Sequence, residues 1–135
     1  MSDLILVWSE TVLDLAELLS DLREPAYIVG GAVRDAVLRR PIKDVDIATA
    51  GSGIALAKKI ANRLKGDFYA LDTGRDVGRA LVDTPEGRLI FDVAGFRGAD
   101  LEADLRDRDF TINALAVHLP GDLQKVIDPT GGIPD

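Results

Sequence analysis

The sequence predicts a single α/β (α+β) domain in which a mixed β-sheet carries helices on one face. Two observations lead to this prediction. Residues 10–22 and 54–64 place apolar side chains at helical spacing, which is typical of amphipathic helices. Short apolar and β-branched runs lie between and after them, and two of these runs are joined by a tight turn. With 135 residues, 47% of them hydrophobic, the chain is long enough for one domain with its own core.

The predicted elements follow one another closely. Ser9 is a suitable N-cap for the first helix, whose apolar stripe indicates core packing, although an exposed part of it could contact a partner. Residues 45–49 are typical of a buried strand, and the second helix, 54–64, ends at Gly66. Of three further strands, the last two form a hairpin through the turn Thr84-Pro85-Glu86-Gly87. These strands cover residues 68–71, 79–83 and 89–93.

A glycine turn leads into a further helix near the start of the sheet. The β-prone run Tyr27-Ile28-Val29 stops at Gly30 and Gly31, and residues 32–38 are predicted to be helical until Pro41. The first N–H groups of a helix lack partners within it, and the helix dipole adds partial positive charge there. Glycines let the backbone come close to a ligand. Such a turn suits phosphate groups, above all a triphosphate.

Two aspartates follow on the next predicted strand. Asp44 and Asp46 are two positions apart, so their side chains point to the same side, roughly 6.5–7 Å apart along the chain. Two carboxylates on one face of an apolar strand repel each other unless a cation compensates. Mg²⁺ prefers a few carboxylates together with phosphate oxygens, so the pair suits a metal–nucleotide complex. An isolated Asp-x-Asp more often marks a solvated edge strand, but directly after a phosphate turn we favour metal binding.

Three motifs occur in order from about Tyr27 to the C-terminus. The first is Gly30-Gly31-x-Val33-Arg34-Asp35 with Asp44-x-Asp46-Ile47-x-Thr49. The second is Arg108-Asp109-Phe110-Thr111-Ile112-Asn113-Ala114, and the third is Ile127-Asp128-Pro129-x-Gly131-Gly132. Together they resemble the signature of class II tRNA nucleotidyltransferases and bacterial poly(A) polymerases. The resemblance implies a polymerase-β-like nucleotidyltransferase fold for the chain.

The resemblance also implies a mechanism and a set of site residues. Asp44 and Asp46 would hold two Mg²⁺ ions, one bridging to the triphosphate of ATP or CTP and the other lowering the pKa of an RNA 3′-hydroxyl for attack on the α-phosphate. The second motif is expected to form a polar loop entering a short helix at residues 111–117. The implied nucleotide-binding residues are Gly30, Gly31, Arg34, Arg108 and Asn113.

Asp92 is a third candidate for a catalytic carboxylate. It interrupts the apolar run 89–94, where an unpaired charge would be costly to bury. From the pattern alone, it can equally be an outward-facing residue of a half-buried strand. The resemblance implies a third carboxylate beside the metal-binding pair, which would complete a metal site or accept the proton of the attacking hydroxyl.

The implied activity is template-independent transfer of a nucleotide to an RNA 3′-hydroxyl, as in CCA or CC addition to tRNA or in poly(A) addition. Residues 1–135 would be the catalytic head domain, and the family's neck, body and tail domains, which select the nucleotide and hold tRNA, would be absent from this chain. Two other functions stay open. One is a non-catalytic or minimal nucleotide-binding module of the same fold, and the other is a transferase that modifies a protein or small molecule.

Two departures from the family pattern affect this expectation. Phe96-Arg97 matches part of the family's Thr-Phe-Arg element, with Gly95 in place of the threonine. Only residues 98–107 separate this element from the Arg108 motif, where typical members have a longer flexible loop that is linked to the switch from CTP to ATP. In the family, members that add only cytidines have this loop shortened. In addition, Asp107 occupies the position of the first arginine of the family's double-arginine motif.

Composition limits the partners. No apolar run is long enough to span a bilayer, which argues against a membrane protein. The lack of cysteine excludes disulfides and thiolate metal sites and is compatible with a cytoplasmic location, and a single histidine leaves no histidine cluster for zinc. A net charge of −7 predicts weak RNA binding by this chain alone, so tRNA is expected to need the other domains. The oligomeric state cannot be predicted.

Overall fold

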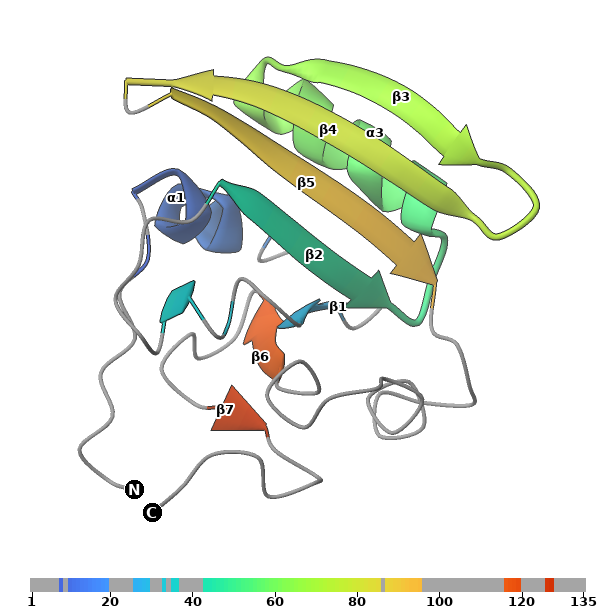
Figure 1. The fold of residues 1–135 in the computed structure, drawn as a ribbon, viewed down its shortest axis with the longest axis horizontal. Helices are drawn as coiled ribbons and strands as arrows, with labels where there is room; N and C mark the ends of the chain where they lie inside the picture. Colours follow the sequence, from blue (N-terminus) through green and yellow to red (C-terminus); the bar gives the residue numbers. More distant parts are fainter. Residues whose placement is uncertain are drawn as a thin grey trace.

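The computed structural model describes most of the first 95 residues and two short strands beyond them (Figure 1). Described are residues 8, 10–19, 26–29, 33, 35–36, 43–85 and 87–95, with the backbone of 116–119 and 126–127. The helices are α1 (Glu10–Leu18) and α3 (Gly53–Leu64). The strands are β1 (Ala26–Val29), β2 (Asp44–Thr49), β3 (Asp67–Asp72), β4 (Val77–Thr84), β5 (Gly87–Gly95), β6 (Ala116–Leu119) and β7 (Val126–Ile127).

The described strands form one mixed sheet in the order β3-β4-β5-β2-β1-β6-β7. Strands β2 and β5 are parallel, and the other neighbouring pairs are antiparallel. A parallel pair needs a long crossover connection, which here consists of α3 and the strands β3 and β4. The predicted mixed sheet is therefore confirmed, and its parallel step lies between the two strands that carry the candidate carboxylates.

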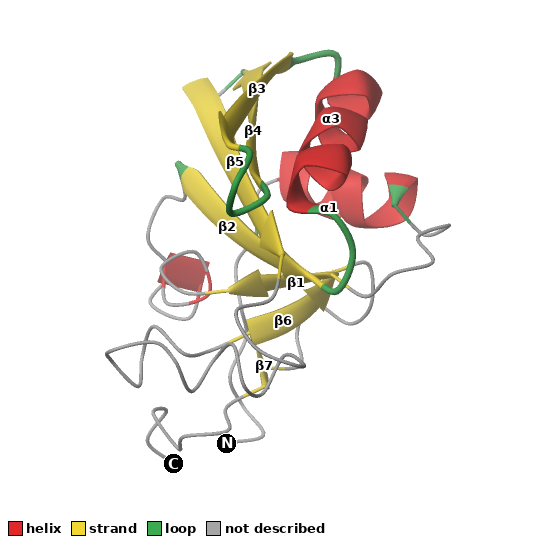
Figure 2. Ribbon diagram, turned by 90° about the vertical axis from the view of Figure 1, so that its right-hand side faces the viewer, coloured by secondary structure: helices red, strands yellow, loops and turns green. Residues whose placement is uncertain are grey.

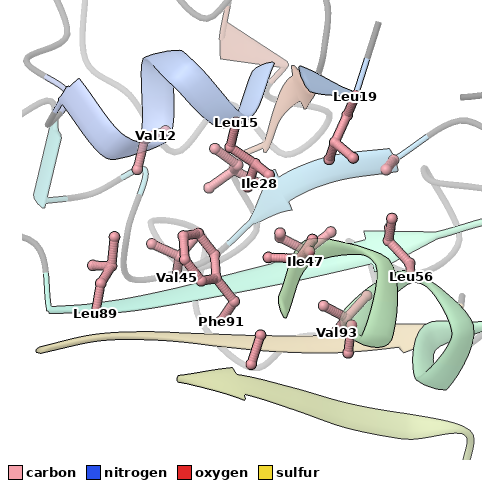
Figure 3. Packing of buried hydrophobic residues seen from close by; sticks show 14 of the residues in the cluster. Val12, Leu15, Leu19, Ile28, Val45, Ile47, Leu56, Leu89, Phe91 and Val93 are labelled. Carbon is pink, nitrogen blue, oxygen red and sulfur yellow. The ribbon is translucent and has the colours of Figure 1, made fainter. Parts of the chain in front are cut away.

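Both helices pack against the same face of the sheet, as Figure 2 shows. Their apolar stripes meet alternate side chains of the central strands, so that a core forms between the two layers (Figure 3). Its largest fully buried members are Phe91, Leu15, Leu19, Ile28, Ile47, Ile60, Val12 and Val33. The predicted arrangement of helices on one face is confirmed for α1 and α3. Neither of these described helices combines the length and apolar character needed to cross a membrane.

The ends of the two helices differ slightly from the prediction. Helix α1 ends at Leu18, and the predicted continuation through residues 20–22 lies outside the described part of the chain, as does Ser9. Helix α3 ends because Lys65, rather than Gly66, takes the left-handed conformation, with φ of 58°. Gly66 serves close packing, since a Cβ at this position would lie 2.2 Å from the backbone oxygen of Leu81.

The hairpin between β4 and β5 is confirmed, with longer strands than predicted. Thr84 pairs with Gly87 at its end, and the Thr84 hydroxyl donates a hydrogen bond to the Gly87 carbonyl at 2.6 Å. Gly87 has φ of +122°, which side chains rarely allow, so the glycine fits this turn. The turn fixes the register of the whole hairpin.

The predicted helix over residues 111–117 is wrong at its end. Ala116 and Val117 belong to β6, where they pair with Val29 and Ile28 of β1. Local composition favours a helix here, but the unpaired edge of β1 offers a row of backbone hydrogen bonds that a strand can satisfy. Residues 111–115 lie outside the described part of the chain.

Asp76 ties the turn between β3 and β4 to the start of α3. Its carboxylate accepts hydrogen bonds from the Gly53 N–H at 2.8 Å, the Ile54 N–H at 3.1 Å and the Ser52 hydroxyl at 2.9 Å. Desolvation raises the pKa of Asp76, but these hydrogen bonds outweigh it and lower the pKa below its ordinary value. The first turn of α3 thus receives a carboxylate where the helix dipole favours negative charge.

Replacing Asp76 by asparagine is expected to destabilise the chain by about 1–3 kcal/mol at pH 7, because charged hydrogen bonds are lost. Asparagine tolerates the left-handed backbone of Asp76, whose φ is 55°, so the change tests the charge. A lowered folded-state pKa means that the stabilisation is complete above the ordinary aspartate pKa of about 4 and fades as pH falls through the folded value. Urea unfolding at pH 7 and pH 3 should therefore show a shrinking difference between wild type and variant.

Asp72→Asn is the matched control. Asp72 is the last residue of β3, directly before this turn, and accepts a hydrogen bond from the Arg75 N–H at 3.0 Å. It is exposed, and no described hydrogen bond joins it to α3. Its replacement should cost less than about 0.5 kcal/mol. A difference for Asp76→Asn that stays constant between pH 7 and pH 3 would contradict the assigned role of the charge.

Candidate active site

Strand β2 presents two carboxylates on the face of the sheet opposite α1 and α3. Along the strand, Asp44 and Asp46 are exposed whereas Val45 and Ile47 are buried. Since side chains alternate along a strand, the two apolar residues anchor the strand in the core and turn both aspartates to the other side. The predicted common orientation of Asp44 and Asp46 is present in the structure.

Asp92 lies beside Asp46 on the neighbouring parallel strand. The two residues pair directly in the register of β2 and β5. Neighbouring strands are about 4.8 Å apart, so paired residues point to the same face side by side. Phe91 and Val93, which flank Asp92, are buried against the helices, while Asp92 itself is half-buried. Asp44, Asp46 and Asp92 therefore share one face, which we call the carboxylate face.

Arg79 on β4 binds Asp92 through both of its oxygens. The Arg79 Nε donates to Oδ1 of Asp92 at 2.7 Å, and Nη2 donates to Oδ2 at 3.0 Å. The side chains are 37% and 28% exposed, so the pair is accessible from solvent. Such a two-pronged arrangement is the geometry in which a guanidinium holds a carboxylate most firmly.

The sequence prediction missed Arg79, although a signal for it was present. A hairpin turn fixes strand register. Counting equal steps back from Thr84 and forward from Gly87 brings Arg79 opposite Asp92, and the structure has this pairing. Arg79 is also flanked by the buried Gly78 and Ala80, so the alternation of β4 already assigns it to the carboxylate face.

All three aspartates raise the pKa of Arg79. The hydrogen bond and the charge of Asp92 raise the pKa of Arg79 most, and the charges of Asp44 and Asp46 raise it further against the effect of desolvation. The guanidinium thus places a positive charge among three of the described carboxylates. It offsets part of the repulsion that three carboxylates on one face would experience.

The strand that precedes the predicted glycine turn ends beside this cluster. Val29, the last residue of β1, pairs with Asp46, and Gly30 is the next residue in the sequence. Val33 and Ala36 are helical and buried, which agrees with the helix predicted after the turn. The remaining candidates are not among the described residues. They are Gly30, Gly31, Arg34, Arg108 and Asn113.

The carboxylate oxygens of Asp44 and Asp46 are suitable ligands for a magnesium ion that is also bound by phosphate groups. In the described ranges, no three carboxylate or histidine side chains are gathered as a ready metal site. Asp44 and Asp46 nevertheless supply two carboxylates, and Mg²⁺ commonly uses one or two carboxylates plus substrate phosphates. Asp92, predicted as a possible third ligand, has both oxygens engaged by Arg79.

The mixed sheet with two helices on one face agrees with the predicted polymerase-β-like nucleotidyltransferase fold. Residues 26–135 match the family of poly(A) polymerase head domains. The chain belongs to this family, as the sequence motifs predicted.

Similar proteins are tRNA nucleotidyltransferases. The chain is 44% identical over 110 residues to a CC-adding tRNA nucleotidyltransferase from Geobacter sulfurreducens. The aligned segment covers 82% of this chain and 25% of that protein. A CCA-adding enzyme in complex with CTP superposes with a TM-score of 0.78 at 32% identity, covering 93% of this chain and 32% of that one. A tRNA nucleotidyltransferase with a primer tRNA and an incoming ATP analogue gives 0.72 at 33% identity, covering 87% and 35%. The chain thus spans about a quarter to a third of these proteins' lengths.

Proposed function

We propose that this chain is the catalytic head of an RNA nucleotidyltransferase that transfers nucleotides from ATP or CTP to a tRNA 3′-hydroxyl in the cytoplasm. The observation that carries the proposal is the position of Asp44 and Asp46. They are exposed on a central strand, and the residue opposite Asp46 leads directly into Gly30. Solved structures of similar chains contain an ATP analogue with tRNA, or CTP.

Each part of the site has a separate task in this proposal. Asp44 and Asp46 would hold two Mg²⁺ ions, which, when bound, neutralise the triphosphate and activate the attacking hydroxyl. Val45 and Ile47 fix the two aspartates by anchoring β2 in the core. The backbone at Gly30 and the side chains of the nucleotide-binding candidates would orient the nucleotide. The candidate side chains are Arg34, Arg108 and Asn113. Asp92, held by Arg79, is the proposed third catalytic carboxylate.

Addition of cytidines is the form of this activity that we favour. The Geobacter sulfurreducens relative is a CC-adding enzyme. In addition, only residues 98–107 separate the Phe96-Arg97 element from the Arg108 motif, and a short segment here is expected of heads that stop after two cytidines. Selection of the base and binding of the tRNA are assigned to domains outside these 135 residues.

A chimera tests the proposal directly. Residues 1–135 would replace the aligned segment of the Geobacter sulfurreducens relative, so that the rest of that protein supplies nucleotide selection and RNA binding. With Mg²⁺, tRNA lacking its 3′ end and labelled CTP or ATP, we expect label at the RNA 3′ end, as two cytidines. The 135-residue chain alone should bind Mg²⁺–nucleotide and transfer it slowly at best, because its net charge of −7 disfavours RNA.

Other outcomes would identify the alternatives. Binding of Mg²⁺–ATP by the chain, with no incorporation by a folded chimera, would indicate a nucleotide-binding module without transferase activity. Label found on protein or on a small molecule instead of RNA would indicate a different acceptor. Addition of two cytidines and then an adenosine, in place of two cytidines alone, would overturn the preference for CC addition. The proposal of a tRNA nucleotidyltransferase would still stand.

A further inference from the structure

Arg79 holds a carboxylate that a divalent metal ion would also need if it used Asp92 as a ligand. Both oxygens of Asp92 accept hydrogen bonds from the Arg79 guanidinium, at 2.7 and 3.0 Å. A metal ion that used Asp92 as a ligand would have to share these oxygens with the guanidinium or displace it. Because the two side chains are 37% and 28% exposed, the pair is open to such an exchange from solvent.

The charge of Arg79 acts on the whole carboxylate face. Asp92 pairs with Arg79 on one side and with Asp46 on the other, so the three residues form one row across β4, β5 and β2. Asp44 is two residues from Asp46 on the same side of β2. Among the side chains described on this face, Arg79 sets one positive charge beside three aspartates. A neutral residue at this position would remove that positive charge, so a bare cation would be attracted more strongly.

A metal–nucleotide complex responds to Arg79 in the opposite sense. Mg²⁺–ATP carries a net negative charge because the triphosphate outweighs the ion. Added negative charge on this face therefore attracts the bare cation but repels the metal–nucleotide complex. A guanidinium in the row weakens binding of the bare cation and strengthens binding of the metal–nucleotide complex. Its planar fork suits phosphate oxygens as well as carboxylates.

We propose that Arg79 is a positioning residue that selects the form in which metal enters the site: it holds Asp92, disfavours a bare divalent cation and favours the anionic metal–nucleotide complex. The inference rests on the proposed function, because it takes Asp44 and Asp46 as the metal-binding pair. It adds to that function an order of events, in which metal and nucleotide enter together.

Binding of Mn²⁺, with and without ATP, tests this inference in the 135-residue chain. Paramagnetic resonance would report free and bound Mn²⁺, and titration calorimetry would report binding of Mn²⁺–ATP. For Arg79→Met we expect Mn²⁺ alone to bind roughly three- to tenfold more tightly and Mn²⁺–ATP to bind weaker by a similar factor, as for loss of one nearby unit charge. For Arg79→Gln we likewise expect tighter binding of Mn²⁺ alone and weaker binding of Mn²⁺–ATP.

Arg88→Met is the matched control on the same hairpin. Arg88 forms the equivalent cross-strand pair with Asp83, with 3.1 Å between Nε and Oδ1, but its pKa is raised by Asp83, Asp67 and Tyr69 and not by the aspartates of β2. Its replacement should leave both affinities unchanged. Circular dichroism would establish that each variant is folded, and the glutamine variant carries the test if the methionine variant is not.

Opposite shifts support the proposal, whereas unchanged affinities or two shifts in the same direction overturn it. A general loss of structure would weaken both forms of binding together, so it cannot imitate the expected result. Asp44→Asn separates failure of this inference from failure of the proposed function. If the Asp44→Asn variant binds Mn²⁺ as tightly as the wild type does, the metal site itself is misassigned. If the Asp44→Asn variant loses Mn²⁺ binding while Arg79→Met changes neither affinity, only the proposed role of Arg79 fails.

Discussion

Replacing Asp44 by asparagine is expected to lower nucleotide incorporation about a thousandfold and to leave the fold intact. The loss reflects several kcal/mol of metal-dependent stabilisation of the transition state, and each 1.36 kcal/mol changes the rate tenfold. The fold should survive because Asp44 is exposed at the start of β2 and asparagine has nearly the same shape. Incorporation of labelled CTP by the chimera, with Mg²⁺ and tRNA lacking its 3′ end, measures the effect.

Asp83→Asn supplies the control for this experiment. Asp83 is an exposed strand aspartate as well, but it lies at the turn end of β4, paired with Arg88. Its replacement should leave incorporation within about twofold of wild type, as expected for a surface change away from the site. Retention of wild-type incorporation by Asp44→Asn would remove Asp44 from the mechanism and with it the metal-binding pair.

Phe91→Ala is expected to destabilise the chain by about 3–5 kcal/mol, the usual cost of removing a large aromatic side chain from a core. Phe91 is fully buried on β5, between Val45 of β2 and Ala80 of β4 (Figure 3). The loss would leave a cavity at the centre of the sheet. It is a large share of the 5–15 kcal/mol by which domains are ordinarily stable, so part of the population should unfold.

Urea denaturation followed by circular dichroism measures this loss. Leu13→Ala is a suitable control because Leu13 lies on α1 but is 47% exposed, and its replacement should cost less than about 1 kcal/mol. A loss below about 1 kcal/mol for Phe91→Ala would show that the helices contribute less to the core than their buried side chains indicate.

Local patterns were sufficient to predict strands β1 to β5 and the orientation of the aspartates. The alternation of exposed and buried residues in β2 depends only on neighbouring positions, so Asp44 and Asp46 could be assigned to one face from sequence. Pairing across strands is not local. The Arg79–Asp92 pair depends on hairpin register, and β6 depends on the free edge of β1, which overrode a local preference for helix. Roles predicted for Gly30, Gly31, Arg34, Arg108 and Asn113 stay predictions.

Because β2 and β5 are parallel and far apart in sequence, we expect the carboxylate face to assemble late in folding. Asp46 and Asp92 become neighbours only when α3, β3 and β4 have crossed over and β5 has inserted beside β2. Contacts that close such a long stretch of chain form slowly compared with helices and hairpins. A chain that has formed its helices and its β4–β5 hairpin would already hold the Arg79–Asp92 pair yet lack Asp46 beside it. Metal–nucleotide binding would then measure completed folding, whereas helical signal would measure only its early part.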